Sequence, residues 1–180
     1  MASRATTSAA AVPTATGVAT TAGPSMESPP TPGAQAASVA IPQCRSANLA
    51  VSLTPPEGAA GSVYRALVFT NSGRRSCQLQ GFPGVSYVGA GDGHQVGPAA
   101  QRVGDRGDEV RIAPGGTASA QLQLVNVTNY DAGVCRPTPV LGLRVYPPGE
   151  TAALVVPATG TGCAGTPPGP QLTVRTITAS

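Results

Sequence analysis

The chain has 180 residues, a formal net charge of +3, four cysteines and one histidine, and it contains neither tryptophan nor lysine. This length suits one domain of ordinary size, and the arginines are scattered rather than gathered into the basic stripe that nucleic-acid binding needs. No run of about eighteen apolar residues occurs, which excludes a membrane-spanning helix of ordinary length.

Residues 1–40 consist mostly of Ala, Thr, Ser, Pro and Gly, and their only charged residues are Arg4 and Glu27. Such a segment buries too little apolar surface to offset the entropy of ordering it, so we predict a disordered linker or stalk. Its composition is typical of an O-glycosylated stalk as well as of a plain spacer. It also lacks the basic and apolar regions of a signal peptide, so the chain either stays inside the cell or has lost an export signal.

Residues 41–180 alternate short apolar runs with turn residues, which predicts one domain of strands rather than helices. Strands are expected at 47–54, 62–71, 77–81, 84–90, within 110–128, and at 141–149, 151–157 and 171–179. A turn is expected at 55–61, and two weak edge strands or a long loop at 94–109. About seven to nine short strands indicate an antiparallel β-sandwich, with a closed barrel as the alternative. The prolines are expected in turns or at strand ends, where a missing N–H costs least.

The four cysteines, Cys44, Cys77, Cys135 and Cys163, lie too far apart for a CxxC redox motif or a zinc knuckle. Separated cysteines in even number indicate two disulfides, for which three connectivities exist. We favour Cys44–Cys77 and Cys135–Cys163, because each pair flanks predicted strands in a way that brings its members together. The competing pair Cys77–Cys135 has the spacing of an immunoglobulin bridge but lacks the accompanying tryptophan and tyrosine. Disulfides persist in oxidising surroundings, so we expect an exported protein.

Three stretches carry a recognisable pattern: "FTNSGRRSCQLQGFPGVSYV", "RIAPGGTASAQL" and "CRPTPVLGLRVYPPGE". Over roughly residues 44–178 they resemble the domain of unknown function 4232 family of exported proteins and lipoproteins from mycobacteria and other actinobacteria. The resemblance implies an immunoglobulin-like sandwich in the cell envelope or outside the cell, and it implies no activity. Lipoproteins of this kind carry a lipid on an N-terminal cysteine. We do not expect that anchor in this chain, because no cysteine precedes Cys44.

The Gly-rich region that contains His94 holds the candidates for chemistry. A catalytic triad of His94 with Asp92 or Asp105 would lack the Gly-x-Ser-x-Gly elbow, so a surface histidine is favoured. Calcium takes oxygen ligands from acidic loops such as the one with Asp92, Asp105, Asp108 and Glu109, but EF-hand spacing is absent. We therefore expect no catalytic residue, no metal and no cofactor. Asp92, His94, Asp105 and Glu109 remain as an alternative ligand loop.

Two further motifs contain arginine. Arg106, Gly107 and Asp108 form the Arg-Gly-Asp tripeptide that animal integrins bind, and a chance match is favoured over an adhesion site at this composition. Arg74 and Arg75 are the only adjacent pair of arginines, and we interpret them as part of a solvated turn.

Taken together, these patterns predict a non-catalytic module for binding or scaffolding, exported to the cell envelope or the extracellular space. The expected partner is a protein or another envelope component and not a nucleic acid. One alternative is a small-ligand carrier or an extracellular enzyme that uses the His94–Glu109 loops. The other is a protein that interacts with host surfaces.

Overall fold

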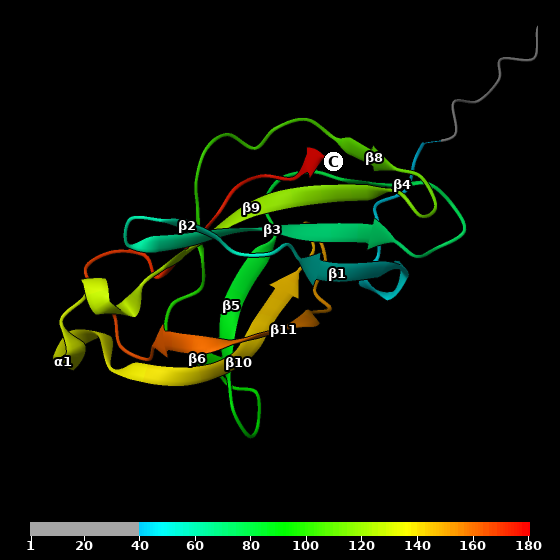
Figure 1. Cartoon of the computed structure of the whole chain (residues 1–180). Helices are drawn as coiled ribbons and strands as arrows, with labels where there is room; N and C mark the ends of the chain where they lie inside the picture. The colour runs from blue at the N-terminus through cyan, green and yellow to red at the C-terminus, as the bar shows by residue number, and fades with distance from the viewer. Residues whose placement is uncertain (1–39) are drawn as a thin grey trace, which may run out of the picture. The chain divides into compact units, whose positions relative to one another are not determined.

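The computed structural model describes residues 40–180, so all but the last residue of the predicted linker lies outside the described residues. Apolar and polar residues alternate along much of this part of the chain, and most of it forms strands (Figure 1). The elements are η1 (Ser46–Asn48), β1 (Leu49–Leu53), β2 (Glu57–Ala59), β3 (Ser62–Asn71), β4 (Cys77–Leu79), β5 (Gly84–Gly89), β6 (Gln95–Val96), β7 (Gln101–Arg102), β8 (Val110–Ile112), β9 (Thr117–Val125), η2 (Val127–Asn129), α1 (Ala132–Cys135), β10 (Pro137–Tyr146), β11 (Leu154–Cys163), β12 (Leu172–Val174) and β13 (Thr178–Ala179). No helix among these is long and apolar enough to cross a membrane.

The larger sheet has the strand order β1-β3-β9-β12-β7, with β2 paired to β3 and β13 paired to β9. Its centre is the long antiparallel pair of β3 and β9, in which Leu67 lies opposite Ala120 and Phe69 opposite Ala118. All four of these side chains are buried, because alternate residues of a strand point to the same face of the sheet. The large residues of β3 therefore pack beside small residues of β9.

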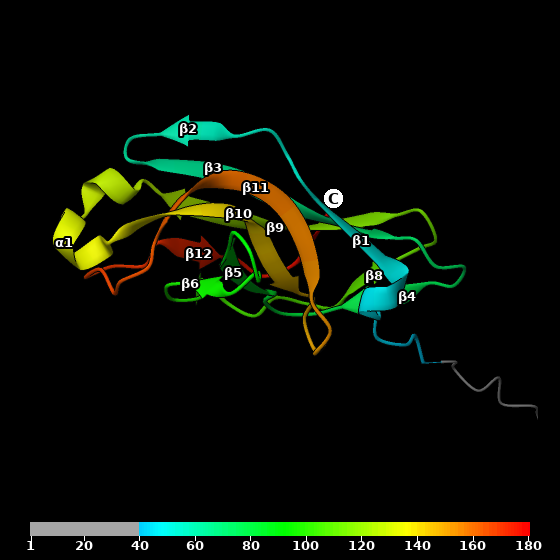
Figure 2. The same ribbon diagram turned by 90° about the horizontal axis from the view of Figure 1, so that it is seen from below.

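The second sheet has the strand order β11-β10-β5-β6, and β4 pairs with β8 in a separate two-stranded sheet. Figure 2 shows β10 and β11 side by side. The pairing of β10 with both of its neighbours shifts register between Val140 and Gly142. β11 pairs only with β10 and forms one edge of this sheet.

Side chains from both sheets meet in one hydrophobic core. Phe69 and Leu122 come from the larger sheet, Leu143 and Val145 from β10, and Ile112 from β8, and all five are at most 1% exposed. Burial of each such side chain contributes about 1.5–3 kcal/mol. The shared core explains why the strongly alternating segments of the sequence all become strands.

The predicted all-β class is confirmed, and the strand predicted at 62–71 has the same bounds as β3. The predicted strand number was wrong, because residues 40–180 contain thirteen strands, several of only two or three residues. β2 lies within the stretch 55–61 that was predicted as a turn. The sheets are also not wholly antiparallel, because β12 and β7 pair in parallel. Strands this short carry too few residues to show a periodic pattern.

Two prolines depart from the expectation that proline lies in turns or at strand ends. Pro139 lies within β10, and Pro157 lies within β11. Pro157 faces Gly142 next to the register shift, on a strand with no second neighbour. The partner strand β5 joins β10 only from Val140 onward, so Pro139 lacks a second neighbour as well. Each proline therefore lies where its strand has only one neighbour, so its missing N–H removes no hydrogen bond to a second strand.

Candidate functional site

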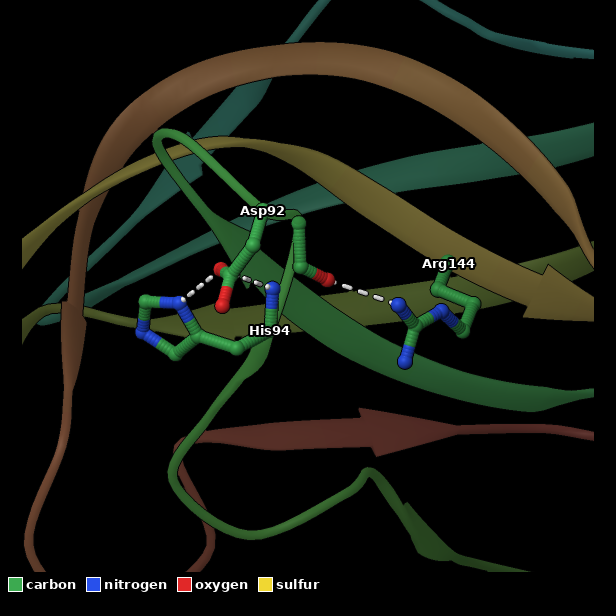
Figure 3. Close-up of polar contacts among 4 residues, drawn as sticks. Asp92, His94 and Arg144 are labelled. Carbon is green, nitrogen blue, oxygen red and sulfur yellow. Dashed lines mark hydrogen bonds and ion pairs between the residues drawn. The ribbon is translucent and has the colours of Figure 1, made fainter.

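The β5–β6 turn carries the single histidine of the chain. Nδ1 of His94 lies 2.7 Å from Oδ1 of Asp92, and the same carboxylate accepts a hydrogen bond from the main-chain N–H of His94 (Figure 3). These contacts lower the pKa of the Asp92 carboxyl below its ordinary value, the hydrogen bond from the His94 side chain being the largest cause. The His94 side chain is 57% exposed and that of Asp92 is 78% exposed. The pair therefore lies on the surface, where water screens its charges.

Arg144 fixes this turn to the second sheet. Its Nη2 donates a hydrogen bond to the main-chain oxygen of Gly93 at 2.6 Å, as Figure 3 shows. Arg144 belongs to β10, so the contact joins two segments that lie far apart in the sequence. The polar contacts of the β5–β6 turn thus hold it in place.

The other two residues of the predicted ligand loop lie elsewhere. Asp105 and Glu109 are exposed in the segment between β7 and β8. Figure 1 shows this segment above the sheets and the β5–β6 turn, which carries Asp92 and His94, below them. The structure thus brings Asp92 and His94 together and leaves Asp105 and Glu109 apart from them. Within residues 40–180, no group of three or more His, Cys, Asp or Glu side chains is placed to hold a metal ion.

The Arg-Gly-Asp tripeptide is exposed in the same β7–β8 segment. The hydroxyl of Thr176 donates to the main-chain oxygen of Arg106, and Nε2 of Gln80 donates to the main-chain oxygen of Gly107 at 3.2 Å. The main chain of the tripeptide is therefore held against neighbouring segments, while the side chain of Asp108 is exposed to solvent.

The cysteines form the two pairs that the sequence analysis favoured. Cys44 is bonded to Cys77 and Cys135 to Cys163, and none of the four is free. Since β1 and β3 pair antiparallel, the residues before β1 and after β3 lie at the same end of the sheet. Cys135 ends α1 just before β10, and Cys163 lies opposite Pro137, where β11 ends.

A large hollow lies between the edges of the two sheets, and we call it the inter-sheet cleft. Its volume is about 820 Å³. The larger sheet contributes β2, β3 and the end of β9 with η2, and the second sheet contributes β11 and one residue of β5. Its lining residues are Pro56, Gly58, Gly61, Ser62, Val63, Arg65, Tyr87, Leu124, Val125, Asn126, Val127, Thr128, Ala158, Thr159, Gly160 and Thr161.

Among the lining residues of the inter-sheet cleft, Arg65 carries the only charge and Tyr87 the only aromatic ring. Arg65 faces Leu122 across the β3–β9 pair, and Leu122 is fully buried, so Arg65 extends from the core-facing side of β3. Its Nε donates to the main-chain oxygen of Thr54 at 2.7 Å. Tyr87 is 5% exposed, and burial raises the pKa of its hydroxyl to about 12. The remaining lining is mostly aliphatic or small and polar.

A second cleft, of about 530 Å³, lies at the Cys44–Cys77 end of the larger sheet. Arg45, Arg74 and Arg75 line it, and all three are exposed. Nδ2 of the buried Asn71 donates to the main-chain oxygen of Arg75 at 2.8 Å and thereby shapes the turn. The placement of Arg74 and Arg75 agrees with the solvated turn expected from the sequence.

Sequence reasoning missed the inter-sheet cleft. One signal was present: Val63, Arg65 and Leu67 share one face of an alternating strand, and an arginine among inward-facing apolar residues is unusual. Which strand edges border the cleft depends on how the two sheets pair and pack, and no local motif encodes that arrangement.

Comparison with protein-family models identifies the family of this domain. The family described as domain of unknown function (DUF4232) matches residues 44–178, which agrees with the resemblance seen in the three motif stretches. This description assigns no activity. No curated protein and no solved structure matches the chain.

Proposed function

We propose that this chain, which belongs to the DUF4232 family, is a non-catalytic exported module that binds a component of the cell envelope in its inter-sheet cleft. The observation that carries the proposal is the cleft itself. At about 820 Å³ it is within the range of ligand sites, which measure about 300–1,000 Å³. Both sheets line it, so it is held by the same core that stabilises the domain.

The lining of the inter-sheet cleft favours binding over catalysis. It contains hydroxyl groups, such as those of Ser62, Thr128 and Thr161, that are potential nucleophiles. A hydroxyl nucleophile needs a positioned base, and no His, Asp, Glu or Cys lines the cleft. His94 and its acidic neighbour lie on the exposed β5–β6 turn instead.

The two disulfides support a location outside the cytoplasm. Each closes a loop of about 30 residues, which is worth about 3–4 kcal/mol in the chain-entropy model. Such bonds persist in oxidising compartments and are rare in reducing ones. Export, attachment to the cell envelope and an actinobacterial source are part of this proposal, as is an immunoglobulin-like arrangement of the two sheets around their shared core.

The alternative of a carrier or enzyme that uses the His94–Glu109 loops has less support. Asp92 and His94 form an exposed pair, and Asp105 and Glu109 belong to a different part of the surface (Figure 1). A role at host surfaces rests on the exposed Arg-Gly-Asp tripeptide alone, so we do not propose it.

Site-specific photo-cross-linking in intact cells tests the proposed function. A photoreactive amino acid replaces Thr161, which lines the inter-sheet cleft, and in a matched variant it replaces the exposed Thr151, which does not line it. We expect a reproducible adduct from position 161 and none from position 151. The same adducts from both positions, or none from position 161, would argue against binding in the cleft.

A further inference from the structure

The inter-sheet cleft contains one cation and no lining carboxylate. Arg65 is half-buried there, and the only hydrogen bond of its side chain within residues 40–180 runs from Nε to the main-chain oxygen of Thr54. None of the residues that line the cleft is acidic. Both terminal nitrogens of the Arg65 guanidinium therefore keep donors for a ligand, and the fork of an arginine matches the two oxygens of a carboxylate.

Tyr87 supplies a second unused donor. Tyr87 is 5% exposed, and its hydroxyl has no hydrogen-bond partner among residues 40–180. Within the same residues, every fully enclosed polar side-chain atom has a partner. The Tyr87 hydroxyl must therefore reach open space, and the space that Tyr87 lines is the inter-sheet cleft. There the hydroxyl can donate a hydrogen bond to water or to a ligand.

Most of the remaining wall is apolar. Val63 and Leu124 face each other across β3 and β9, and Val127 and Ala158 line the cleft from η2 and β11. Leu124 and Ala158 also pack against the hydrophobic core. These apolar side chains offer a ligand no hydrogen bond, so this part of the wall suits an aliphatic chain.

We propose that the inter-sheet cleft binds an amphipathic monocarboxylate, with its carboxylate on Arg65 and its aliphatic chain along Val63, Leu124 and Val127. The Tyr87 hydroxyl donates to an oxygen of the same ligand. A single negative charge is inferred because the cleft holds a single positive one. This inference rests on the proposed function and names the chemical class of the component that the cleft binds.

Binding of three probes to the full chain tests the head group without any variant. The probes are dodecanoate below its micellar concentration, dodecanol with the same chain and a neutral head, and acetate with the head alone. Calorimetry is expected to show dodecanoate binding at least about tenfold more tightly than dodecanol, since a hydrogen bond to a charged group is worth about 1.5–3 kcal/mol. Acetate is expected not to bind. Equal binding of dodecanoate and dodecanol, or no binding of dodecanoate, would overturn the inference.

Two variants then assign the contacts. Arg65→Gln is expected to weaken dodecanoate binding by about tenfold and to leave dodecanol binding unchanged, whereas Arg111→Gln, the same change at an exposed site in β8, alters neither. Tyr87→Phe keeps the ring and is expected to weaken dodecanoate binding by a smaller factor. An equal loss for both probes in Arg65→Gln would mean that Arg65 acts through the fold and would contradict the assigned contact.

The binding and cross-linking experiments together distinguish failure of this inference from failure of the proposed function. If dodecanoate does not bind while the photo-cross-linker at Thr161 still captures a component, the binding module stands and the ligand class is wrong. If dodecanoate binds and no adduct forms in cells, the chemistry of the cleft stands and its proposed role in the envelope fails.

Discussion

The side-chain oxygen of Gln171 accepts a hydrogen bond from the main-chain N–H of Cys163 at 2.8 Å, in the interior of the domain. Nε2 of the same amide donates to the main-chain oxygens of Val96 and Pro98 at 3.1 and 3.2 Å. Gln171 is 1% exposed. One buried side chain thus satisfies main-chain groups where β6 and β11 end and their ladders stop.

Replacement of this amide is expected to destabilise the domain. Gln171→Leu keeps a similar volume and leaves the buried N–H of Cys163 without its hydrogen-bond partner, at about 1–3 kcal/mol. Urea denaturation should therefore show a loss of about 1–3 kcal/mol, whereas Gln121→Leu at an exposed position of β9 should change stability by less than about 0.5 kcal/mol. Similar losses in the two variants would show that the buried amide is dispensable.

Gly97 is expected to be among the glycines least tolerant of substitution. Its φ is +66°, and a Cβ at this position would overlap the main-chain oxygen of Cys163. Gly91 provides a matched control, because its φ is +86° and a Cβ there would meet nothing within 4 Å. We expect Gly91→Ala to cost about 1 kcal/mol from backbone strain alone and Gly97→Ala at least about 3 kcal/mol, measured by urea denaturation. Equal costs would mean that the close approach at Gly97 relaxes freely.

The Cys135–Cys163 disulfide is expected to be a major source of stability. It joins residues 28 positions apart, so the double variant Cys135→Ala with Cys163→Ala should lose about 3–4 kcal/mol. The bond between Cys44 and Cys77 spans 33 positions, and its removal should cost a similar amount. The measurement is urea denaturation under oxidising conditions. A loss below about 1 kcal/mol for either pair would contradict this contribution.

Tyr87 is expected to make the domain sensitive to alkali. Burial raises the pKa of its hydroxyl from 10.0 to about 12, so the folded state holds this proton more tightly than the unfolded state. The resulting stability is fully present below pH 10 and is lost as the pH rises toward about 12. The chain has no lysine and its cysteines are bonded, so tyrosines dominate titration in this range.

The measurement compares wild type with Tyr87→Phe. The unfolding free energy of the wild type should fall by up to about 2 kcal/mol more than that of the variant over this interval. The phenolate absorbance of the wild type should likewise contain a component with a pKa of about 12 that Tyr87→Phe lacks. Parallel stability curves for the two proteins would mean that the Tyr87 hydroxyl is not in a low-dielectric environment.

The sequence allowed the long elements to be predicted because their side chains alternate over many residues. β3 matched its prediction, since Leu67 and Phe69 mark its buried face. β2 was not foreseen, because glutamate, glycine and alanine are all uncommon in strands, and Glu57–Ala59 forms a strand only by pairing with β3. β7 is similarly short, and its parallel pairing with β12 depends on tertiary packing.

The candidate sites differ in the same way, because contacts between residues close in sequence could be predicted and contacts that depend on packing could not. Asp92 and His94 are two residues apart, so their contact could be inferred from the sequence, whereas Asp105 and Glu109 are near them in number only. The inter-sheet cleft brings Arg65 of β3 together with residues of β11, and that proximity exists only once both sheets pack on one core.

We propose that this chain is a module cross-linked by two disulfides that works outside the cytoplasm. The most direct test is the intact mass of the native protein isolated from its own cells, measured without and then with reductant. We predict a gain of about four hydrogens on reduction, since both disulfides should be formed in an oxidising compartment. No gain, with four free thiols in the native protein, would contradict the claim and place the chain in a reducing compartment.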